Sequence, residues 1–337
     1  MAKNTAIDPE PQKSEVGVEQ TLRPQKLTDF VGQDDLKRQL RIIIAAAKKR
    51  REPVDHLLFY GPPGLGKTTL ASLIAKEMEV NIRITSGPAI ERAGDLASIL
   101  TALEKGDIFF IDEVHRLNKV VEETLYPAME DFCLDVVLGK GPAARTLRLE
   151  LNRFTVVAAT TRIGLLSSPM RDRFGFVHRL DFYNEAELQQ IVCRSAEVLR
   201  VKIDHQAALE IARRSRGTPR IANRFLRRVR DYAEVEADGQ ISLAVARAAL
   251  DMLAVDKQGL TQADRQLLFA LAQKHQGGPV GIETLAASIN EDIGTIQEVY
   301  EPFLMQVGLL KRTPRGRMLT AQAFKFLGLP ALDKQLF

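Results

Sequence analysis

A short segment rich in glycine has the spacing of a loop that binds a polyphosphate. Residues 61–68 read Gly-Pro-Pro-Gly-Leu-Gly-Lys-Thr and lie between an apolar run and a helical pattern. Such a loop lets backbone N–H groups face phosphate oxygens, and the helix that follows presents its positive end to the same anion. Lys67 is expected to reach the β- and γ-phosphates and Thr68 to bind Mg²⁺. The predicted ATP-binding residues of this segment are Gly61, Gly64, Gly66, Lys67, Thr68 and Thr69.

Two carboxylates follow a second apolar run, Ile-Phe-Phe-Ile at 108–111. A buried strand that ends in two carboxylates can place one near Mg²⁺ and one near the attacking water. We therefore predict Asp112 as the metal residue and Glu113 as the general base. The pair could instead cap a helix that starts near Leu117. The phosphate loop upstream favours catalysis, although a nucleotide kinase could share both motifs.

The segments around these residues predict the elements that position them. Short apolar runs alternate with helical patterns from about residue 40 to residue 180, which indicates a parallel sheet covered by helices. Leucines and valines that alternate with polar residues on both sides of Gly139 and Pro142 predict a hairpin over 134–151. The predicted strands of the sheet are 56–60, 81–85, 107–111 and 154–159.

Beyond residue 183 the strand patterns stop and helical patterns follow one another. A small helical domain is the simplest account of 185–199, 207–214, 219–237 and 243–255. A third unit shows helical patterns over 260–275, 282–289 and 292–307 and then a short basic turn, which is the layout of a winged helix. We predict a flexible tail over 1–21, an α/β ATPase domain over 22–183, a helical lid over 184–255 and a winged helix over 256–337.

The composition limits the alternatives. The chain has 337 residues, 45% of them hydrophobic and 27% charged, as in a soluble globular protein. No apolar stretch approaches the ~18 residues that span a bilayer, and the first residues lack the pattern of a secretory signal. We therefore expect a cytoplasmic protein without a membrane segment. Cys133 and Cys193 belong to no CxxC or Cys/His cluster, so neither a disulfide framework nor a zinc site is indicated.

The order of several motifs along the chain resembles the AAA+ ATPases, and closely resembles the RuvB family, bacterial motors for branch migration of Holliday junctions. The resemblance runs from Leu22 to about Leu329. It implies a fold of three parts: a P-loop domain, a lid and a winged helix. The motifs that carry it are Leu-Arg-Pro at 22–24, Phe-Val-Gly-Gln at 30–33, the phosphate loop, Ile-Asp-Glu-Val-His-Arg-Leu at 111–117, Tyr-Pro-Ala-Met-Glu-Asp-Phe at 126–132, Ala-Thr-Thr-Arg at 159–162 and Gly-Thr-Pro-Arg at 217–220.

The resemblance assigns roles that the residues alone would not. It implies that Thr161 is sensor 1, which reads the γ-phosphate or orients water, and that Arg220 is sensor 2 on the lid. It also implies two groups beside the nucleotide. The residues implied to border the adenine are Leu22, Arg23 and Tyr183, and those implied to lie near the nucleotide are Glu130, Asp131 and Phe132.

The segment 169–175 resembles the part of the family that carries an arginine finger. Arg173 is the chosen finger because it directly precedes Phe-Gly, and Arg171 is the alternative. A finger acts in trans, so it implies that a neighbouring subunit completes each active site. Such residues can supply ~10³ to 10⁵ in rate. A surface ion pair would be the ordinary role of an arginine here.

The case for DNA rests on the basic turn. Four of the seven residues from 311 to 317 are basic and none is acidic, which suits phosphate contacts that ignore sequence. The predicted DNA-binding residues are Lys311, Arg312, Arg315 and Arg317, of which the resemblance marks Arg312 and Arg317. The resemblance also implies a homo-hexamer, docking of the partner RuvA on the 134–151 hairpin, and work with the resolvase RuvC.

Two other functions fit an ATPase of this class. One is a protein-remodelling or clamp-loading AAA+ subunit, but the sequence shows no aromatic-glycine pore loop and no zinc-binding insert. The other is a passive nucleotide-gated DNA switch, which intact Glu113 and Arg173 disfavour. The leading prediction is an ATP-driven, sequence-independent DNA motor.

Overall fold

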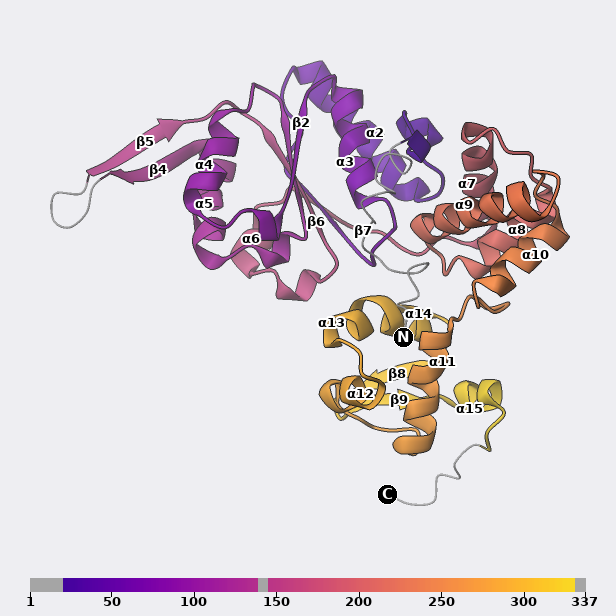
Figure 1. Ribbon diagram of the computed structural model, residues 1–337. Coiled ribbons are helices and arrows are strands. Elements are labelled where there is room, and N and C mark those ends of the chain that lie inside the picture. The colour runs from indigo at the N-terminus through magenta and orange to yellow at the C-terminus, as the bar shows by residue number, and fades with distance from the viewer. Residues whose placement is uncertain (1–20, 139–144, 331–337) are drawn as a thin grey trace. The chain divides into compact units, whose positions relative to one another are not determined.

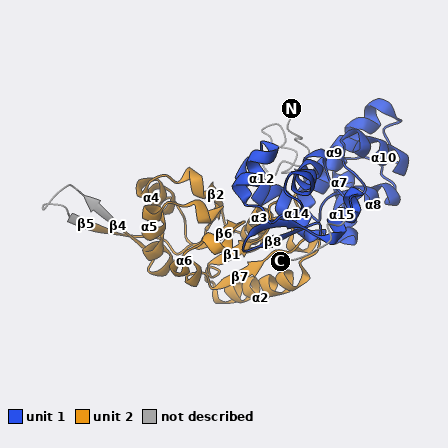
Figure 2. Ribbon diagram, turned by 90° about the horizontal axis from the view of Figure 1, so that it is seen from below, with its two compact units in different colours: residues 1–22, 183–337 blue, residues 23–182 orange. Residues whose placement is uncertain are grey.

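The computed structural model describes residues 21–138 and 145–330. They form two compact units, Arg23–Phe182 and Tyr183–Phe337 with the start of the chain, coloured separately in Figure 2. The predicted flexible tail lies outside the described residues, apart from Thr21.

The first unit is built on a parallel sheet of five strands in the order β2-β3-β6-β1-β7. Parallel strands buried on both faces are rich in apolar residues, as the predicted runs are. All four predicted strands are confirmed, and a fifth, β7, was not predicted. The strands are β1 (Leu57–Tyr60), β2 (Ile82–Ser86), β3 (Ile108–Asp112), β6 (Thr155–Thr160) and β7 (Phe176–Arg179).

Helices cover the two faces of this sheet (Figure 1). Because side chains alternate along a strand, Phe109 and Ile111 of β3 enter one hydrophobic cluster with α4, α5 and α6. On the other face α3 packs against β3 and β6, and α2 packs against α3. The helices are α2 (Asp34–Arg50), α3 (Lys67–Met78), α4 (Ala93–Thr101), α5 (Lys119–Glu130) and α6 (Ser168–Asp172), with short 3₁₀ turns η2 (Leu27–Asp29), η3 (Gly87–Ala89), η4 (Val114–Arg116) and η6 (Ile163–Leu165).

The predicted hairpin is confirmed as β4 (Cys133–Leu138) paired antiparallel with β5 (Arg145–Glu150). At its base Leu134 is buried in the cluster of the first unit, opposite Leu149 in the register. Farther along, Leu147 is 46% exposed. The predicted turn at 139–142 lies outside the described residues. The hairpin is thus anchored at its base and exposes apolar surface farther out.

The second unit begins with the four predicted helices of the lid. The first of them is started by a capping box, in which Asn184 and Glu187 satisfy each other's backbone N–H groups. The helices are α7 (Glu185–Val198), α8 (His205–Arg214), α9 (Pro219–Glu236) and α10 (Leu243–Met252).

The last part of the chain is a winged helix, as predicted. Its wing is an antiparallel pair, and an isolated bridge from Val280 to Arg317 places β9 between Val280 and β8. A final helix that the sequence did not predict follows the wing. The elements are α11 (Gln262–Phe269), the π-helical η7 (Ala270–Lys274), α12 (Ile282–Ile289), α13 (Ile293–Thr295), the π-helical η8 (Ile296–Tyr300), α14 (Glu301–Gln306), β8 (Leu310–Thr313), β9 (Gly316–Leu319) and α15 (Ala321–Leu327).

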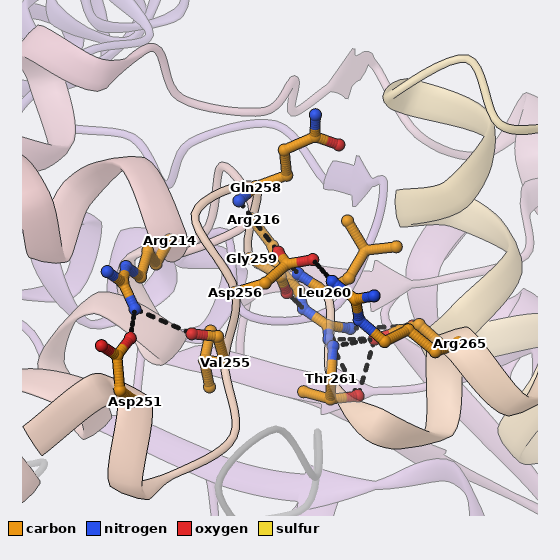
Figure 3. A network of polar contacts seen from close by, with 11 residues as sticks. Arg214, Arg216, Asp251, Val255, Asp256, Gln258, Gly259, Leu260, Thr261 and Arg265 are labelled. Atoms are coloured by element: carbon orange, nitrogen blue, oxygen red, sulfur yellow. Dashed lines mark hydrogen bonds and ion pairs between the residues drawn. The ribbon is translucent and has the colours of Figure 1, made fainter. Parts of the chain in front are cut away.

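Two buried arginines of the lid form a polar network, and one of them binds the winged helix within this unit (Figure 3). Arg216 is 4% exposed, donates from Nε to the Gly259 carbonyl at 2.8 Å and forms an ion pair with Asp264, which is fully buried. Its guanidinium also lies 4.6 Å from the ring centroid of Phe303. Arg214 donates to the Val255 carbonyl at 2.8 Å, a contact within the lid itself. Because a buried charge is tolerated only when it is paired, the contacts of Arg216 fix the winged helix against the lid.

Three other features were sought in the described residues: disulfides, metal-binding clusters and membrane-spanning helices. Cys133 and Cys193 are free thiols. No group of His, Cys, Asp or Glu side chains in the described ranges could by itself hold a metal ion. Over the same ranges, none of the helices has both the length and the apolar character to cross a membrane.

Candidate nucleotide site and DNA-binding wing

The phosphate loop follows β1 and leads directly into α3. Gly61 has φ +141°, and a Cβ there would lie 2.5 Å from the Leu180 carbonyl oxygen, so the close approach to β7 requires glycine. Gly66 has φ +98° and caps α3 at its amino-terminal end. Lys67, Thr68 and Thr69 form the first turn of α3. The loop is therefore shaped to present the backbone N–H groups of a helix start to an anion.

Lys67 and Thr68 point their polar atoms toward the sheet and the loop. Lys67 is 7% exposed, and its ammonium donates to the carbonyls of Gly61 at 2.8 Å and Pro62 at 2.9 Å. The Thr68 hydroxyl donates to Asp112 Oδ2 at 3.4 Å, which joins the phosphate loop to the end of β3. The two predicted Mg²⁺ residues thus offer neighbouring oxygen atoms, and oxygen is the ligand atom that Mg²⁺ prefers. This donor set fits the predicted cation.

Glu113 is held by residues of two elements. Its Oε2 accepts hydrogen bonds from Thr161 N at 3.1 Å and Thr161 Oγ1 at 3.0 Å, and lies 3.2 Å from His115 Nδ1. Burial alone would raise the pKa of Glu113, but the hydrogen bonds from His115 and Thr161 and the charge of Lys67 outweigh burial and lower that pKa. The carboxylate therefore stays ionised, as a general base must be.

The register of the parallel strands explains why these residues meet. Strand β6 lies between β3 and β1, with Ile111 opposite Ala158 and Thr160 opposite Tyr60. The phosphate loop follows β1, Asp112 ends β3 with Glu113 directly after it, and Thr161 follows β6. Since parallel strands end at the same edge, the topology collects all of them at the carboxyl edge of the sheet.

His115 is a site residue that sequence reasoning missed. Its Nδ1 lies 2.8 Å from Thr160 Oγ1 as well as near Glu113, and its side chain is 6% exposed. The only signal was its place two residues after Glu113 in a motif already recognised. It contacts the carboxylate of the predicted base and the end of β6 at once.

Glu130, Phe132 and Arg173, which were also predicted to lie at a nucleotide, lie at the opposite edge of the sheet. The Phe132 ring packs against His56, which precedes β1, and edge-on against Phe154, which precedes β6, at a centroid distance of 5.8 Å. Arg173, which precedes β7, pairs with Glu130 at 3.1 Å. These residues therefore gather at the amino edge of the sheet.

Two neighbours of that group differ in their surroundings. Asp131 accepts from Arg148 of the hairpin at 3.2 Å. Arg171, the alternative finger, is exposed, whereas the Arg173 side chain is 18% exposed and held by several contacts.

The predicted adenine residues and sensor 2 belong partly to the second unit. The Leu22 carbonyl accepts from Arg194 of α7 at 2.9 Å, and the Tyr183 N–H donates to the Gly217 carbonyl at 2.9 Å. Burial raises the pKa of the Tyr183 hydroxyl. Arg220 is half-buried in the first turn of α9, three residues after Gly217. Leu22, Tyr183 and the Gly217 segment therefore stay connected within this unit, while Arg23 belongs to the first unit.

The wing presents three of its four basic residues to solvent. Lys311, Arg312 and Arg315 are exposed. Arg317 differs from the expectation of a DNA contact: it is 7% exposed and its guanidinium forms an ion pair with the buried Glu301 of α14. The reason is its place on β9, the inner strand of the wing. The available basic surface is therefore formed by Lys311, Arg312 and Arg315.

Comparisons with known proteins agree over the whole chain. Residues 22–180 match the family model "Holliday junction DNA helicase RuvB P-loop domain", residues 183–256 the "RuvB AAA lid domain" and residues 257–328 the "RuvB C-terminal winged helix domain".

Two curated relatives, the "Holliday junction branch migration complex subunit RuvB" of Chloroflexus aggregans and of Chloroflexus aurantiacus, are each 59% identical over 336 residues, covering 100% of this chain and 96% of theirs. A solved structure of Thermotoga maritima RuvB, described as a Holliday junction branch migration motor, is 48% identical with a TM-score of 0.84, covering 92% of this chain and 99% of that one. The chain belongs to the RuvB family of P-loop ATPases.

Proposed function

We propose that this protein is the ATP-driven motor that moves Holliday junctions during homologous recombination and DNA repair. The observation that carries the proposal is the division of the catalytic residues between two edges of one sheet. The phosphate loop, Asp112 and Glu113 lie at the carboxyl ends of their strands, while Arg173 precedes β7. Asp55, just before β1, lies beside Gly175 of the segment that carries Arg173, and Gly61 follows β1 at its other end. Six residue steps separate Asp55 from Gly61, so at ~3.3 Å per residue the two edges lie roughly 20 Å apart.

This separation means that Arg173 does not serve the nucleotide bound by its own chain. A ring in which the amino edge of one subunit meets the carboxyl edge of the next would bring Arg173 to a neighbouring phosphate. Head-to-tail contacts of this kind form a ring when the rotation between neighbours closes, and the hexamer that the family resemblance implies is the proposed assembly. Glu130, Asp131 and Phe132 lie at the same edge and are proposed to face the neighbour's nucleotide too.

Within each chain, ATP would bind at the carboxyl edge of the sheet. Lys67 binds the β- and γ-phosphates, and Glu113 accepts the proton of the attacking water. Thr161, which already bonds Glu113, senses the γ-phosphate and places the base. Thr68 and Asp112 would hold Mg²⁺, which when bound neutralises phosphate charge. Lys67 is the residue whose loss should abolish nucleotide binding.

The lid is proposed to respond to the bound nucleotide through residues that contact the adenine and the γ-phosphate. Leu22, Arg23 and Tyr183 would border the adenine, and Arg220 would contact the γ-phosphate as sensor 2. A cation at the first turn of a helix is unfavourable beside the helix dipole, so Arg220 gains most when an anion arrives.

The DNA surface is proposed to be the wing, through Lys311, Arg312 and Arg315. Phosphate contacts position a protein without reading bases, which suits a motor that moves along any sequence. We assign to Arg317 the structural role of fixing the wing to α14.

The exposed apolar part of the 134–151 hairpin, including Leu147, is the proposed docking site for RuvA. Action in the cytoplasm, and a resolving complex with RuvC, complete the proposal.

Mixed rings test the shared active site. Glu113→Gln should bind ATP without hydrolysing it, and Arg173→Ala should assemble without turning over. When the two are mixed, an interface that joins Glu113 of one variant to Arg173 of the other is intact. Random mixing at equal amounts restores roughly a quarter of the interfaces in a closed ring. ATP hydrolysis should therefore reappear on mixing.

The double variant Glu113→Gln with Arg173→Ala is the matched control, because it contributes neither half and should restore nothing. No recovery at any mixing ratio would refute the site shared between subunits. The motor itself is tested with a synthetic four-way junction, RuvA and Mg-ATP. Hydrolysis that leaves the junction unmoved would refute the proposed function.

A further inference from the structure

The guanidinium of Arg173 is held by contacts with three neighbouring groups. Its Cζ lies 4.0 Å from the ring centroid of Tyr126. One nitrogen pairs with Glu130 at 3.1 Å, and Nη1 donates to the Pro169 carbonyl at 2.6 Å. Nε is buried and has no hydrogen-bond partner among the described residues. An aromatic face, one carboxylate and one carbonyl therefore define where this cation lies.

The element that carries Arg173 is too short to hold itself in place. Helix α6 has five residues and Arg173 is its C-cap. Isolated helices of this length do not form in water, so α6 takes its position from contacts with the rest of the unit.

Tyr126 of α5 supplies contacts at both ends of α6. Its hydroxyl donates to Glu122 Oε1 at 2.5 Å and lies 3.1 Å from Ser167 Oγ. Ser167 is the N-cap of α6, where its hydroxyl accepts from Met170 N at 3.2 Å, and it bonds Glu122 as well. The hydroxyl of Tyr126 thus fixes the start of α6, while its ring lies against the arginine at the end.

A ring face stabilises a cation and also restricts the plane of a guanidinium. The three hydroxyl and carboxylate groups of Tyr126, Glu122 and Ser167 bond one another, so the ring is not free to turn away. The contacts of Tyr126 therefore fix the Arg173 guanidinium relative to helix α5.

We propose that Tyr126 is a positioning residue for Arg173, holding it ready to reach the nucleotide of the neighbouring subunit. This inference rests on the proposed function, since it needs Arg173 to act in trans. Glu122 and Ser167 serve the same purpose by fixing the Tyr126 hydroxyl. A group displaced by ~1 Å can cost ~10²-fold in rate without changing what binds.

Two substitutions separate the ring from the hydroxyl. Tyr126→Leu removes both the face under Arg173 and the bond to Ser167, and should lower kcat for ATP by about 10- to 100-fold while leaving the KM for ATP near its wild-type value. Tyr126→Phe keeps the ring and should lose less. Glu123→Gln, on the same helix with an exposed side chain, is the matched control and should behave as wild type. Unchanged melting curves establish that the variants are folded.

Mixed rings distinguish a positioning role of Tyr126 from a merely structural one. Tyr126→Leu mixed with Glu113→Gln should recover activity as Arg173→Ala does, because the defect lies on the finger side of the interface. In the Arg173→Ala background, Tyr126→Leu should cause no further loss of residual activity.

Full activity of Tyr126→Leu, a raised KM with unchanged kcat, or an additive loss in the Arg173→Ala background would each overturn the inference. These outcomes are distinct from failure of the proposed function. If Arg173→Ala itself hydrolyses ATP normally, the proposed finger is wrong. If Arg173→Ala is inactive and Tyr126→Leu is fully active, only the positioning role fails.

Discussion

The ion pair between Arg216 and Asp264 should be the most costly single contact to break in the second unit. Asp264 is fully buried and accepts from the N–H and hydroxyl of Thr261, both at 2.7 Å, in addition to its pair with Arg216. Asp264→Asn keeps the shape and can keep a bond to Thr261, but it leaves the Arg216 cation buried and unpaired. Arginine does not deprotonate in proteins, so the charge cannot be relieved by losing a proton. Removing one partner of a buried pair costs about 3–5 kcal/mol.

That loss is large enough to be seen by calorimetry of the full chain. A unit of this size loses about 2–4 °C of Tm per kcal/mol, so the transition of the second unit should fall by roughly 6–20 °C. Asp231→Asn is the matched control, because Asp231 pairs with Arg228 at 3.1 Å with both side chains 45% exposed. An exposed pair of this kind contributes about 0–1 kcal/mol. A loss for Asp264→Asn no larger than for Asp231→Asn would refute the reasoning.

A second variant tests the cause. Arg216→Met added to Asp264→Asn removes the unpaired charge, and a pair replaced by neutral groups of similar size is often close to neutral in stability. The double variant should therefore be more stable than Asp264→Asn alone. If it is less stable, the cost comes from lost packing and not from the buried charge.

Three further outcomes are expected. Arg312→Ala should weaken binding to all duplexes alike and reduce the slope of log K against log salt by about 1, measured by fluorescence anisotropy over a salt series. Glu301→Gln should instead lower the stability of the winged helix, because Arg317 is then buried without a counter-charge, and an unchanged melting curve would contradict this. Thr161→Val removes a hydrogen bond that lowers the pKa of Glu113, so that pKa rises. The acid limb of kcat/KM should then move to higher pH than in the wild type, and identical limbs would refute the assigned contact.

The strands and helices that could be predicted are those with strong apolar patterns. Strand β3 is buried along Ile108–Ile111 and was found from those residues alone. Strand β7 was missed because Phe-Val-His-Arg alternates between half-buried and exposed positions at the edge of the sheet, so it lacks an apolar run. Helix α15 has seven residues and only Ala323 buried, which leaves no stripe to detect.

The sequence proposes residues for the site, but it does not predict the edge of the sheet on which each of them lies. Glu130 and Glu113 are both acidic residues beside an apolar segment. What separates them is whether they follow or precede a strand of the sheet: Glu113 follows β3, whereas Glu130 ends α5 and meets Arg173 before β7. That distinction needs β7, which the sequence did not reveal. The structural support for a site shared between subunits therefore comes from topology.

The wing shows a limit of another kind, since Arg312 and Arg317 are opposite each other in the register but only Arg312 is exposed, while Arg317 is buried against Glu301. Directly opposed residues of an antiparallel pair point to the same face, so alternation cannot separate them. Position across the sheet does: β8 is an edge strand, and β9 lies between β8 and Val280, where Glu301 reaches it. Counting basic residues treats both as phosphate contacts. The ion pair removes one charge from the proposed DNA surface and fixes the wing to α14, so a DNA phosphate bound by Arg312 would contact a strand pair that is anchored to the helices of the winged domain.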